Sequence, residues 1–261
     1  MRLKSFFFLV FNAAKMTLTA KQIIVNPFNT FIFFLRSALN VKSAFCMFRF
    51  QGISFYSRGL DWFGVEEVLL NGEYDEVLVE LKSLVDPVVL DLGANIGAFS
   101  IRAFAYNPRC TIYSVEPGWK TCEVLRKNQL ENPSFKWNIF QVAVWNRSGF
   151  VGFNDNLDAS TSSKILPDNQ ESKVPVVRLA DLIKGHIGLP IDIVKIDVEG
   201  VEEDILFDSV EALSLMKTLI VEIHPARCNE NKVRVLLKEN FLNVREVNGR
   251  RSSKPLLVCT N

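Results

Sequence analysis

The sequence predicts an α/β fold built on a doubly wound, mostly parallel sheet of seven strands. From residue 88 onward, short apolar runs alternate with segments of helical periodicity, which is the pattern of β-α-β units with helices on both faces of a parallel sheet. Five such units precede two short apolar runs separated by Asn248 and Gly249, which predict a terminal hairpin and one antiparallel strand. Hydrophobic residues make up 48% of the chain and charged residues 23%, an ordinary globular balance.

The segment before this sheet carries its own signals. Residues 48–59 alternate apolar and polar side chains around Gly52, which is typical of a β-hairpin. Residues 61–84 carry helical spacing that is broken at Asn71 and Gly72. The entry to the sheet is therefore expected to be a hairpin followed by helical turns.

In the repeating part, each expected strand is a continuous apolar run, as a strand buried on both faces requires. The runs are residues 88–93, 111–117, 135–144, 191–200 and 218–225. One-sided apolar spacing predicts the intervening helices, which are residues 98–106, 119–128, 201–216 and 231–241. Residues 146–175 are rich in Asn, Asp and Ser, and two short apolar patches there predict an added hairpin or lid.

The distribution of charge divides the chain near residue 60. Residues 1–60 contain eight basic residues, no acidic residue and 12 of the 21 phenylalanines. The remaining 22 basic and 29 acidic residues give residues 61–261 a net charge of −7. We therefore expect a basic, aromatic extension with helices and a hairpin, residues 1–60, joined to one domain, residues 61–261.

Two interpretations of the extension stay open. Its uncharged runs are shorter than the ~20 apolar residues that a spanning helix needs, and it lacks the small-residue cleavage site of a signal peptide. Either its phenylalanines pack helices over one side of the domain, or they make peripheral contact with a membrane while Lys and Arg meet anionic lipid.

Composition excludes several classes of protein. The net charge of +1 gives no reason to expect a nucleic-acid partner. Five scattered cysteines without a C-x-x-C pair exclude a disulfide framework and the usual zinc sites, and they indicate a reducing compartment, so a cytoplasmic location is expected. The two histidines, His186 and His224, are too few for a multi-histidine metal site.

Acidic residues end four of the five expected strands, namely Asp91, Glu116, Asp197 and Glu222. In such sheets, ligands bind at the carboxyl ends of the strands. The loop of residues 93–97 lacks the spacing of a dinucleotide fingerprint and the lysine of a P-loop, but its glycines allow the backbone to approach a ligand closely. A carboxylate at Glu116 suits both hydroxyls of a ribose. A nucleoside without phosphates, such as S-adenosylmethionine, therefore fits better than NAD.

The motifs DLGANIGAFS, SVEP, QVAV, KIDVEGVEEDIL and IVEIHP follow one another between Asp91 and Pro225. Through them, the sequence resembles the FkbM-type family of S-adenosylmethionine-dependent methyltransferases. The resemblance implies the Rossmann-like fold of class I methyltransferases and S-adenosyl-L-methionine as cofactor. It also implies transfer of a methyl group, often to a hydroxyl of a sugar, lipid or natural product.

The resemblance further implies a set of cofactor-binding positions. Those around the methionine part of the cofactor are Asp91, Gly93, Asn95 and Gly97. Glu116 would hold the ribose, and the backbone near Ala143 would face the adenine. Asp197, followed by Glu199, would lie beside the methyl group. Asn128 recurs in the family pattern, although it could equally be a helix C-cap.

The general base is the least defined part of the expected site. The rate of in-line methyl transfer depends mainly on alignment of the acceptor oxygen with the methyl group, which can be worth effective molarities on the order of 10⁵–10⁸ M. A general base raises the rate by only about 10²–10⁴-fold. His224 is the first candidate, because its ordinary pKa of about 6.5 suits proton removal near neutral pH. Asp197 and Glu199 come next. Together with Glu222 these residues have the types that bind Mg²⁺, but we expect no metal.

The acceptor is not specified by any motif. We expect O-methylation of a hydroxyl on a sugar, a glycan, a lipid-linked saccharide or a small natural product. N-methylation of an amine or a protein side chain is an alternative that the cofactor motifs leave open. A non-catalytic module that binds nucleosides or protein partners on the same fold is the third interpretation.

Overall fold

A computed structural model describes residues 3–41, 44–154, 164–166, 173–188, 190–247 and 254–261. The turn predicted at Asn248 and Gly249 lies outside the described residues, as does the middle of the region 146–175.

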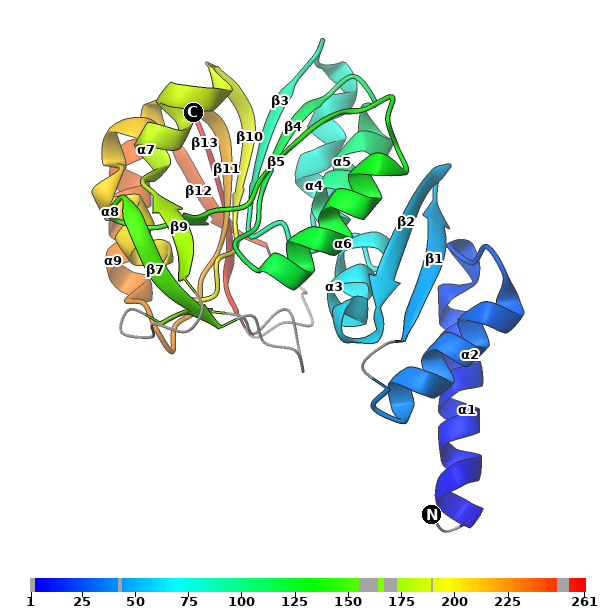
Figure 1. Cartoon of the computed structure of the whole chain (residues 1–261). Helices are drawn as coiled ribbons and strands as arrows, with labels where there is room; N and C mark the ends of the chain where they lie inside the picture. Colours follow the sequence, from blue (N-terminus) through cyan, green and yellow to red (C-terminus); the bar gives the residue numbers. More distant parts are fainter. Residues whose placement is uncertain (1–2, 42–43, 155–163, 167–172, 189, 248–253) are drawn as a thin grey trace.

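The centre of the protein is a seven-stranded sheet with the order β12-β13-β11-β10-β3-β4-β5 (Figure 1). Among the described strands of this sheet, β13 alone runs opposite to the other six. The strands are β3 (Val88–Leu92), β4 (Thr111–Val115), β5 (Lys136–Phe140), β10 (Ile191–Ile196), β11 (Met216–Glu222), β12 (Asn243–Glu246) and β13 (Leu256–Thr260). This topology confirms the predicted fold class.

Helices cover both faces of the sheet. They are α5 (Ala98–Tyr106), α6 (Trp119–Leu130), α8 (Glu202–Asp208) and α9 (Glu230–Asn240), with the short α7 (Leu179–Leu182). Along β3, Val89 belongs to the apolar core that contains α5 and α6, whereas Leu90 and Leu92 belong to the core that contains α8 and α9. The sheet is thus buried on both sides, which explains why its strands are continuous apolar runs.

One predicted helix is interrupted in the structure, and one broken segment is found as expected. The helix expected at 201–216 breaks at Ser209, whose hydroxyl accepts a hydrogen bond from the Ala180 N–H at 3.2 Å and also bonds Asp208. A 3₁₀ helix then covers Val210–Leu215. The region 61–84 is a chain of short helices with a break at Asn71 and Gly72, as its spacing predicted. Their bounds are Gly59–Asp61, Trp62–Val65 (α3), Glu66–Leu70, Asp75–Leu78 (α4) and Val79–Ser83.

A second, four-stranded sheet with the order β6-β9-β7-β8 lies beside the first. Its strands are β6 (Ala143–Val144), β7 (Gly149–Asn154), β8 (Lys164–Leu166) and β9 (Lys173–Val177). The strand predicted at 135–144 therefore divides, because its last two residues leave the central sheet and pair with β9. The two apolar patches of this region pair as antiparallel strands β7 and β9, although β8 lies between them in the chain and pairs with the other edge of β7.

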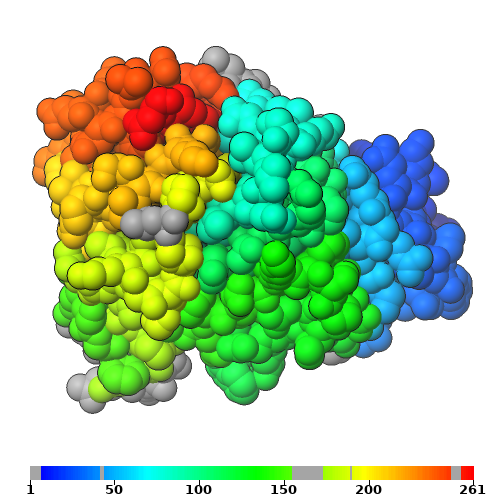
Figure 2. All heavy atoms as spheres, turned by 90° about the horizontal axis from the view of Figure 1, so that it is seen from above, coloured from blue at the N-terminus to red at the C-terminus, as the bar shows by residue number. Residues whose placement is uncertain are grey.

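Two helices and a hairpin precede the central sheet in the chain. They are α1 (Leu3–Thr19), α2 (Pro27–Ala38), β1 (Phe45–Phe50) and β2 (Ile53–Arg58). Asn26 caps α2 by accepting a hydrogen bond from the Asn29 N–H at 3.0 Å. Figures 1 and 2 show α1 and α2 (blue) at one end of the molecule, beyond the hairpin. Among the described residues, no helix combines the length and apolar character that crossing a bilayer requires.

Part of the aromatic extension is core. Phe33, Phe34, Phe48, Phe55 and Trp62 are buried side chains of one aromatic cluster, in which neighbouring ring centroids lie 4.6 to 6.4 Å apart. The packing interpretation is confirmed for these side chains. The phenylalanines of α1 that the structure describes are instead exposed.

The hairpin is joined to the domain through Asn128 on α6. The Asn128 Oδ1 atom accepts a hydrogen bond from the Tyr56 N–H at 2.7 Å, and its Nδ2 atom donates to the carbonyls of Tyr56 and Ile96 at 3.1 and 2.8 Å. Because α6 continues to Leu130, Asn128 is not a C-cap. It connects the hairpin to the loop after β3.

Candidate active site

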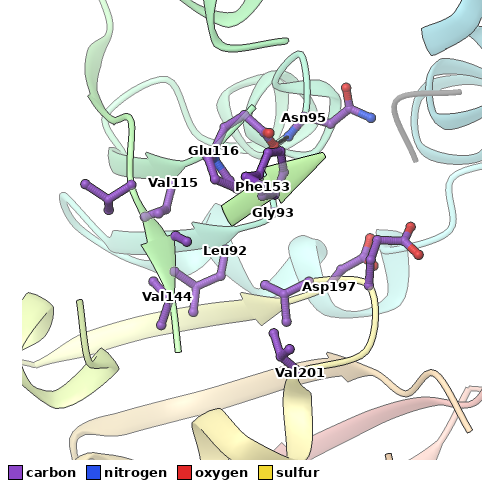
Figure 3. A pocket seen from close by; sticks show the side chains of 14 residues that line it. Leu92, Gly93, Asn95, Val115, Glu116, Val144, Phe153, Asp197 and Val201 are labelled. Carbon is purple, nitrogen blue, oxygen red and sulfur yellow. Dashed lines mark hydrogen bonds between the residues drawn. The ribbon is translucent and has the colours of Figure 1, made fainter. Parts of the chain in front are cut away.

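A pocket of about 660 Å³ opens at the carboxyl ends of β3, β4 and β10 (Figure 3). Asn95 and Glu116 lie on one side of it, and Asp197 and Val201 on the other. Its remaining walls are largely apolar, with contributions from Leu92, Val115, Ala143, Val144 and Phe153. This is the position at which open α/β sheets bind ligands.

The loop after β3 is held in a tight bend against β10. The N–H groups of Gly93 and Ala94 both donate to the Val115 carbonyl at 3.0 Å. Gly93 has a φ of +76°, and a Cβ atom there would lie 1.8 Å from the carbonyl oxygen of Asp197. Glycine is therefore required at Gly93, both for the left-handed backbone and for the close approach of β3 and β10.

The Glu116 carboxylate is fixed by backbone donors. Its Oε2 atom accepts from the Asn95 N–H at 2.9 Å, and its Oε1 atom accepts from the Gly118 N–H at 2.8 Å. The side chain is only 7% exposed and lines the pocket. Both carboxylate oxygens are thus oriented, and further lone pairs on them can accept hydrogen bonds from a ligand.

Two predicted cofactor positions lie away from the pocket walls. Asp91 is completely buried; it accepts hydrogen bonds from Ser100 Oγ at 2.8 Å and from Lys195 Nζ at 3.3 Å. Gly97 begins α5 with a φ of +92°, and a Cβ atom there would meet Trp137 at 2.6 Å. The geometry gives both residues a supporting position behind the loop.

Lys195 contacts the loop after β3 and the two acids beside it. Its ammonium donates to the Gly93 carbonyl at 3.0 Å and lies 3.3 Å from Asp91 and 3.5 Å from Asp197. Burial opposes the charge of Lys195, but these two carboxylates outweigh it and raise the pKa. Burial raises the pKa of Asp91; the charge of Lys195 and the hydrogen bond from Ser100 offset this only in part, and the nearby charge of Asp197 adds to it. Lys195 therefore pairs with both neighbouring acids.

Asp197 and Glu199 follow β10 and face His224, which follows β11. His224 Nε2 lies 3.1 Å from Glu199 Oε2 and 3.9 Å from Asp197 Oδ1, while Nδ1 lies 2.7 Å from Glu202 Oε1. Glu199 has a φ of +58°, an uncommon conformation for a residue with a side chain. The structure therefore brings together all three residues considered as catalytic, and Glu202 with them.

The pKa of His224 differs from the expectation on which its role as a base depended. Burial would lower the pKa, but hydrogen bonds to Glu199 and Glu202 and the charge of Asp197 raise it to about 10. With this pKa the ring carries both of its protons at neutral pH, so Nδ1 donates to Glu202 and Nε2 faces Glu199 at 3.1 Å, and the ring cannot take up a further proton. No feature of the sequence predicts this shift, because the sequence does not reveal that Glu199, Glu202 and Asp197 surround the ring.

Asp197 stays ionised. Burial would raise its pKa, but the charges of Lys195, His224 and Lys254 outweigh burial and lower the pKa. Ligand atoms of Asp197, Glu199 and His224 lie within 4.8 Å of one another, a spacing that could suit a metal ion. Lys195 and Lys254 already bring ammonium groups within 3.5 and 3.6 Å of Asp197 and Glu199, which weakens the case for a metal here.

A second pocket of about 1070 Å³ shares Gly93, Asn95, Asp197 and Glu199 with the first. Its other walls come from the helical turns of residues 61–74 and from β11 and the start of the final strand, including Phe63, Tyr74, Glu222 and Lys254. Sequence reasoning missed Phe63, Tyr74, Phe153 and Lys254, because nothing in their local pattern distinguishes them from ordinary core or surface residues.

Comparisons with known proteins agree with this geometry. Residues 91–248, more than half of the chain, match the family described as the methyltransferase FkbM domain. The chain belongs to the FkbM methyltransferase family. This confirms the resemblance seen in the sequence, and membership of this family implies S-adenosylmethionine as the methyl donor.

Three methyltransferases are similar to this chain in sequence. The 2-O-methyltransferase NoeI of Sinorhizobium fredii is 28% identical over 163 residues, 56% of this chain. The hexuronic acid methyltransferase AglP of Haloferax volcanii is 27% identical over 172 residues, 65% of this chain. The 31-O-demethyl-FK506 methyltransferase FkbM of Streptomyces tacrolimicus is 26% identical over 170 residues, 52% of this chain. The matches cover 66%, 70% and 65% of these relatives, so this chain spans about two thirds of their length.

A solved structure supports the fold independently. The METTL16 MTase domain superposes with a TM-score of 0.54 at 12% sequence identity, covering 96% of this chain and 91% of that domain. At this level of identity the likeness concerns the fold alone. It agrees with the Rossmann-like architecture expected for an FkbM-type methyltransferase.

Proposed function

We propose that this protein transfers the methyl group of S-adenosylmethionine to a hydroxyl of a saccharide acceptor. Family membership supports methyl transfer. The names of two relatives specify an oxygen, and the name of a third specifies a hexuronic acid as its substrate. These names favour O-methylation over N-methylation. The observation that carries the proposal is the Glu116 carboxylate, which two backbone N–H groups orient into a pocket that has no phosphate-binding motif.

The residues of the first pocket fit an adenosyl group. Glu116 would accept hydrogen bonds from the ribose hydroxyls, and the apolar wall at Val115, Ala143 and Val144 would cover the adenine. Gly93 and Asn95 line the pocket, so the methionine part would lie against the backbone of this loop and beside Asn95. Asp91 and Gly97 would act from behind the loop rather than by contact.

S-adenosylmethionine supplies a methyl group that is already activated on a positively charged sulfur. Asp197 and Glu199 line both pockets, so we place the reacting groups where the two pockets meet. Carboxylates at this position would stabilise a cationic ligand and accept a hydrogen bond from the acceptor hydroxyl. Alignment of that hydroxyl is the main catalytic contribution we assign to the protein.

His224 has a different role in this proposal. As an imidazolium, it would hold Glu199 by the 3.1 Å contact and would not accept the proton of the hydroxyl. Glu199 and Asp197 remain the candidate catalytic residues, and His224 becomes a positioning residue. The second pocket, with Phe63 and Tyr74 among its walls, is the place we assign to the acceptor.

Two measurements test the proposed function. Titration calorimetry with S-adenosylmethionine and with NAD should give binding of the first compound and none of the second. Incubation with methyl-labelled S-adenosylmethionine and fractionated saccharides from cell extract should then label a saccharide in a base-stable ether linkage. Binding of NAD alone, or label found only on amines or proteins, would contradict the proposal.

A further inference from the structure

The outer face of α1 carries large apolar side chains. Phe7, Phe8 and Phe11 are 63%, 64% and 68% exposed, and Leu18 is 71% exposed. Phe7, Phe11 and Leu18 recur at spacings of four and seven residues, so they share one face of the helix, and Phe8 stands at its margin. We refer to these four side chains as the α1 face.

The opposite side of α1 is already packed. Ala13 and Ala20 are almost completely buried, and α1 lies against α2, whose Phe33 and Phe34 enter the aromatic core. The helix is thus formed and held by its inner side. The four side chains of the α1 face are each more than 60% exposed, so they present apolar surface to the surroundings of the molecule.

The charge around the α1 face has one sign. Residues 1–60 contain eight basic residues and no acidic residue, whereas the rest of the chain carries a net charge of −7. Lys15, on the same side of α1 as Leu18, and Lys21, just beyond the helix, are both exposed. An apolar face bordered by lysines without any acid is the pattern of helices that lie in the interface of an anionic membrane.

We propose that the α1 face docks this protein on an anionic lipid surface, with the phenylalanines at the level of the headgroups and the lysines on lipid phosphates. A protein partner of ordinary mixed charge would not require the absence of acids over 60 residues. The docking itself does not depend on the proposed methyl transfer.

Vesicle sedimentation with the full chain tests this proposal. Vesicles of phosphatidylglycerol and phosphatidylcholine should sediment the wild-type protein, and vesicles of phosphatidylcholine alone should sediment much less of it. Raising the salt from 0.1 to 0.5 M should weaken binding to the anionic vesicles. Replacing Phe7, Phe8 and Phe11 together by Ser should reduce the partition coefficient at least about tenfold.

A control variant separates the α1 face from exposed aromatic residues in general. Phe150 on β7 and Phe207 on α8 are also exposed, and replacing both by Ser should leave vesicle binding unchanged. Thermal unfolding and S-adenosylmethionine binding should be the same in both variants, since none of these residues lines the described pockets at the active site.

Two results would overturn the proposal. One is sedimentation that is equal for the wild type and the triple serine variant, or absent for both. The other is a wild-type dimer in light scattering that becomes a monomer in the triple variant without any vesicle binding, which would assign the α1 face to a second copy of the chain. Failure of vesicle binding with intact methyl transfer would remove only the docking proposal.

Discussion

The Nδ1 atom of His224 lies 2.7 Å from the Oε1 atom of Glu202, whose side chain is completely buried. The same oxygen accepts a hydrogen bond from the Gly200 N–H at 2.9 Å. This one carboxylate therefore fixes both the turn after β10 and the histidine after β11. It also explains why the ring holds its proton and why it lies against Glu199 on its other side.

The first prediction concerns the pH dependence of stability. Because the folded pKa of His224 is about 10 and the unfolded value is near 6.5, its ionic contribution is fully present below pH 6.5 and is lost as the pH rises through 10. The stability advantage of the wild type over His224→Gln should fall across this window by up to about 1.4 kcal/mol per pH unit. Urea unfolding of both proteins at pH 6, 8 and 9.5 measures it. A difference that does not change with pH would contradict the assignment, as would a ring that titrates near pH 6.5 by NMR.

The second prediction concerns Glu116. Replacing it by Ala removes the acceptor that Asn95 and Gly118 orient, so the Kd for S-adenosylmethionine should rise by about 100-fold or more. Glu116→Gln should be intermediate, because its amide group would face one of the two N–H donors. Calorimetry measures the affinities, and Glu123→Ala, an exposed change on α6, should bind as the wild type does. Unchanged affinity in Glu116→Ala would place the ribose elsewhere.

The third prediction separates two costs at Gly93. Gly93→Ala combines a left-handed φ with a Cβ atom 1.8 Å from the Asp197 carbonyl, so it should lower the free energy of unfolding by at least ~3 kcal/mol. Gly52→Ala is the matched control, because Gly52 has a φ of +91° with nothing within 4 Å of the added atom. It should cost only about 1–2 kcal/mol. Equal losses in urea unfolding would show that the close approach of β3 and β10 is not constraining.

The fourth prediction concerns the buried ammonium of Lys195. Lys195→Met leaves Asp91 and Asp197 without the charge that they share, which should destabilise the fold by about 3–5 kcal/mol. Adding Asp91→Asn should restore part of the loss. Lys217→Met breaks an exposed pair with Asp192 and should cost less than about 1 kcal/mol. The prediction fails if Lys195→Met unfolds at the same urea concentration as Lys217→Met.

Helices and strands could be predicted where burial makes apolar residues recur at a regular spacing in the sequence. The helix expected at residues 98–106 is the observed α5, and each expected strand of the central sheet is present, because side chains that are buried on one or both faces repeat at the period of the element. Prediction failed where a polar contact from another part of the chain interrupts the period. Ser209 ends α8 early because it bonds the backbone of Ala180, which no local pattern reveals.

Some parts of the candidate site could likewise be predicted from the sequence, and others could not. The loop with Gly93 and the carboxylate of Glu116 could be found because they follow strands whose ends meet at one edge of the sheet. The protonation state of His224 could not be found, since it depends on Glu202, a residue of α8 that sequence presents as one of several helix acids. The roles of Phe63 and Tyr74 depend on the path of the short helices, which helical spacing alone does not determine.

The amide of Asn128 has a practical consequence for dissecting this protein. It is buried, and two of its three hydrogen bonds go to Tyr56, with the third reaching the carbonyl of Ile96 in the bend that follows β3. A shortened chain that begins at residue 61 would lack Tyr56, so the buried Asn128 amide would lose two of its hydrogen bonds. The side chain that contacts the bend after β3 would then be less firmly held. Deleting residues 1–60 would therefore disturb the pocket that we assign to the methyl donor. Point substitutions on the exposed face of α1 test the role of that helix without this effect.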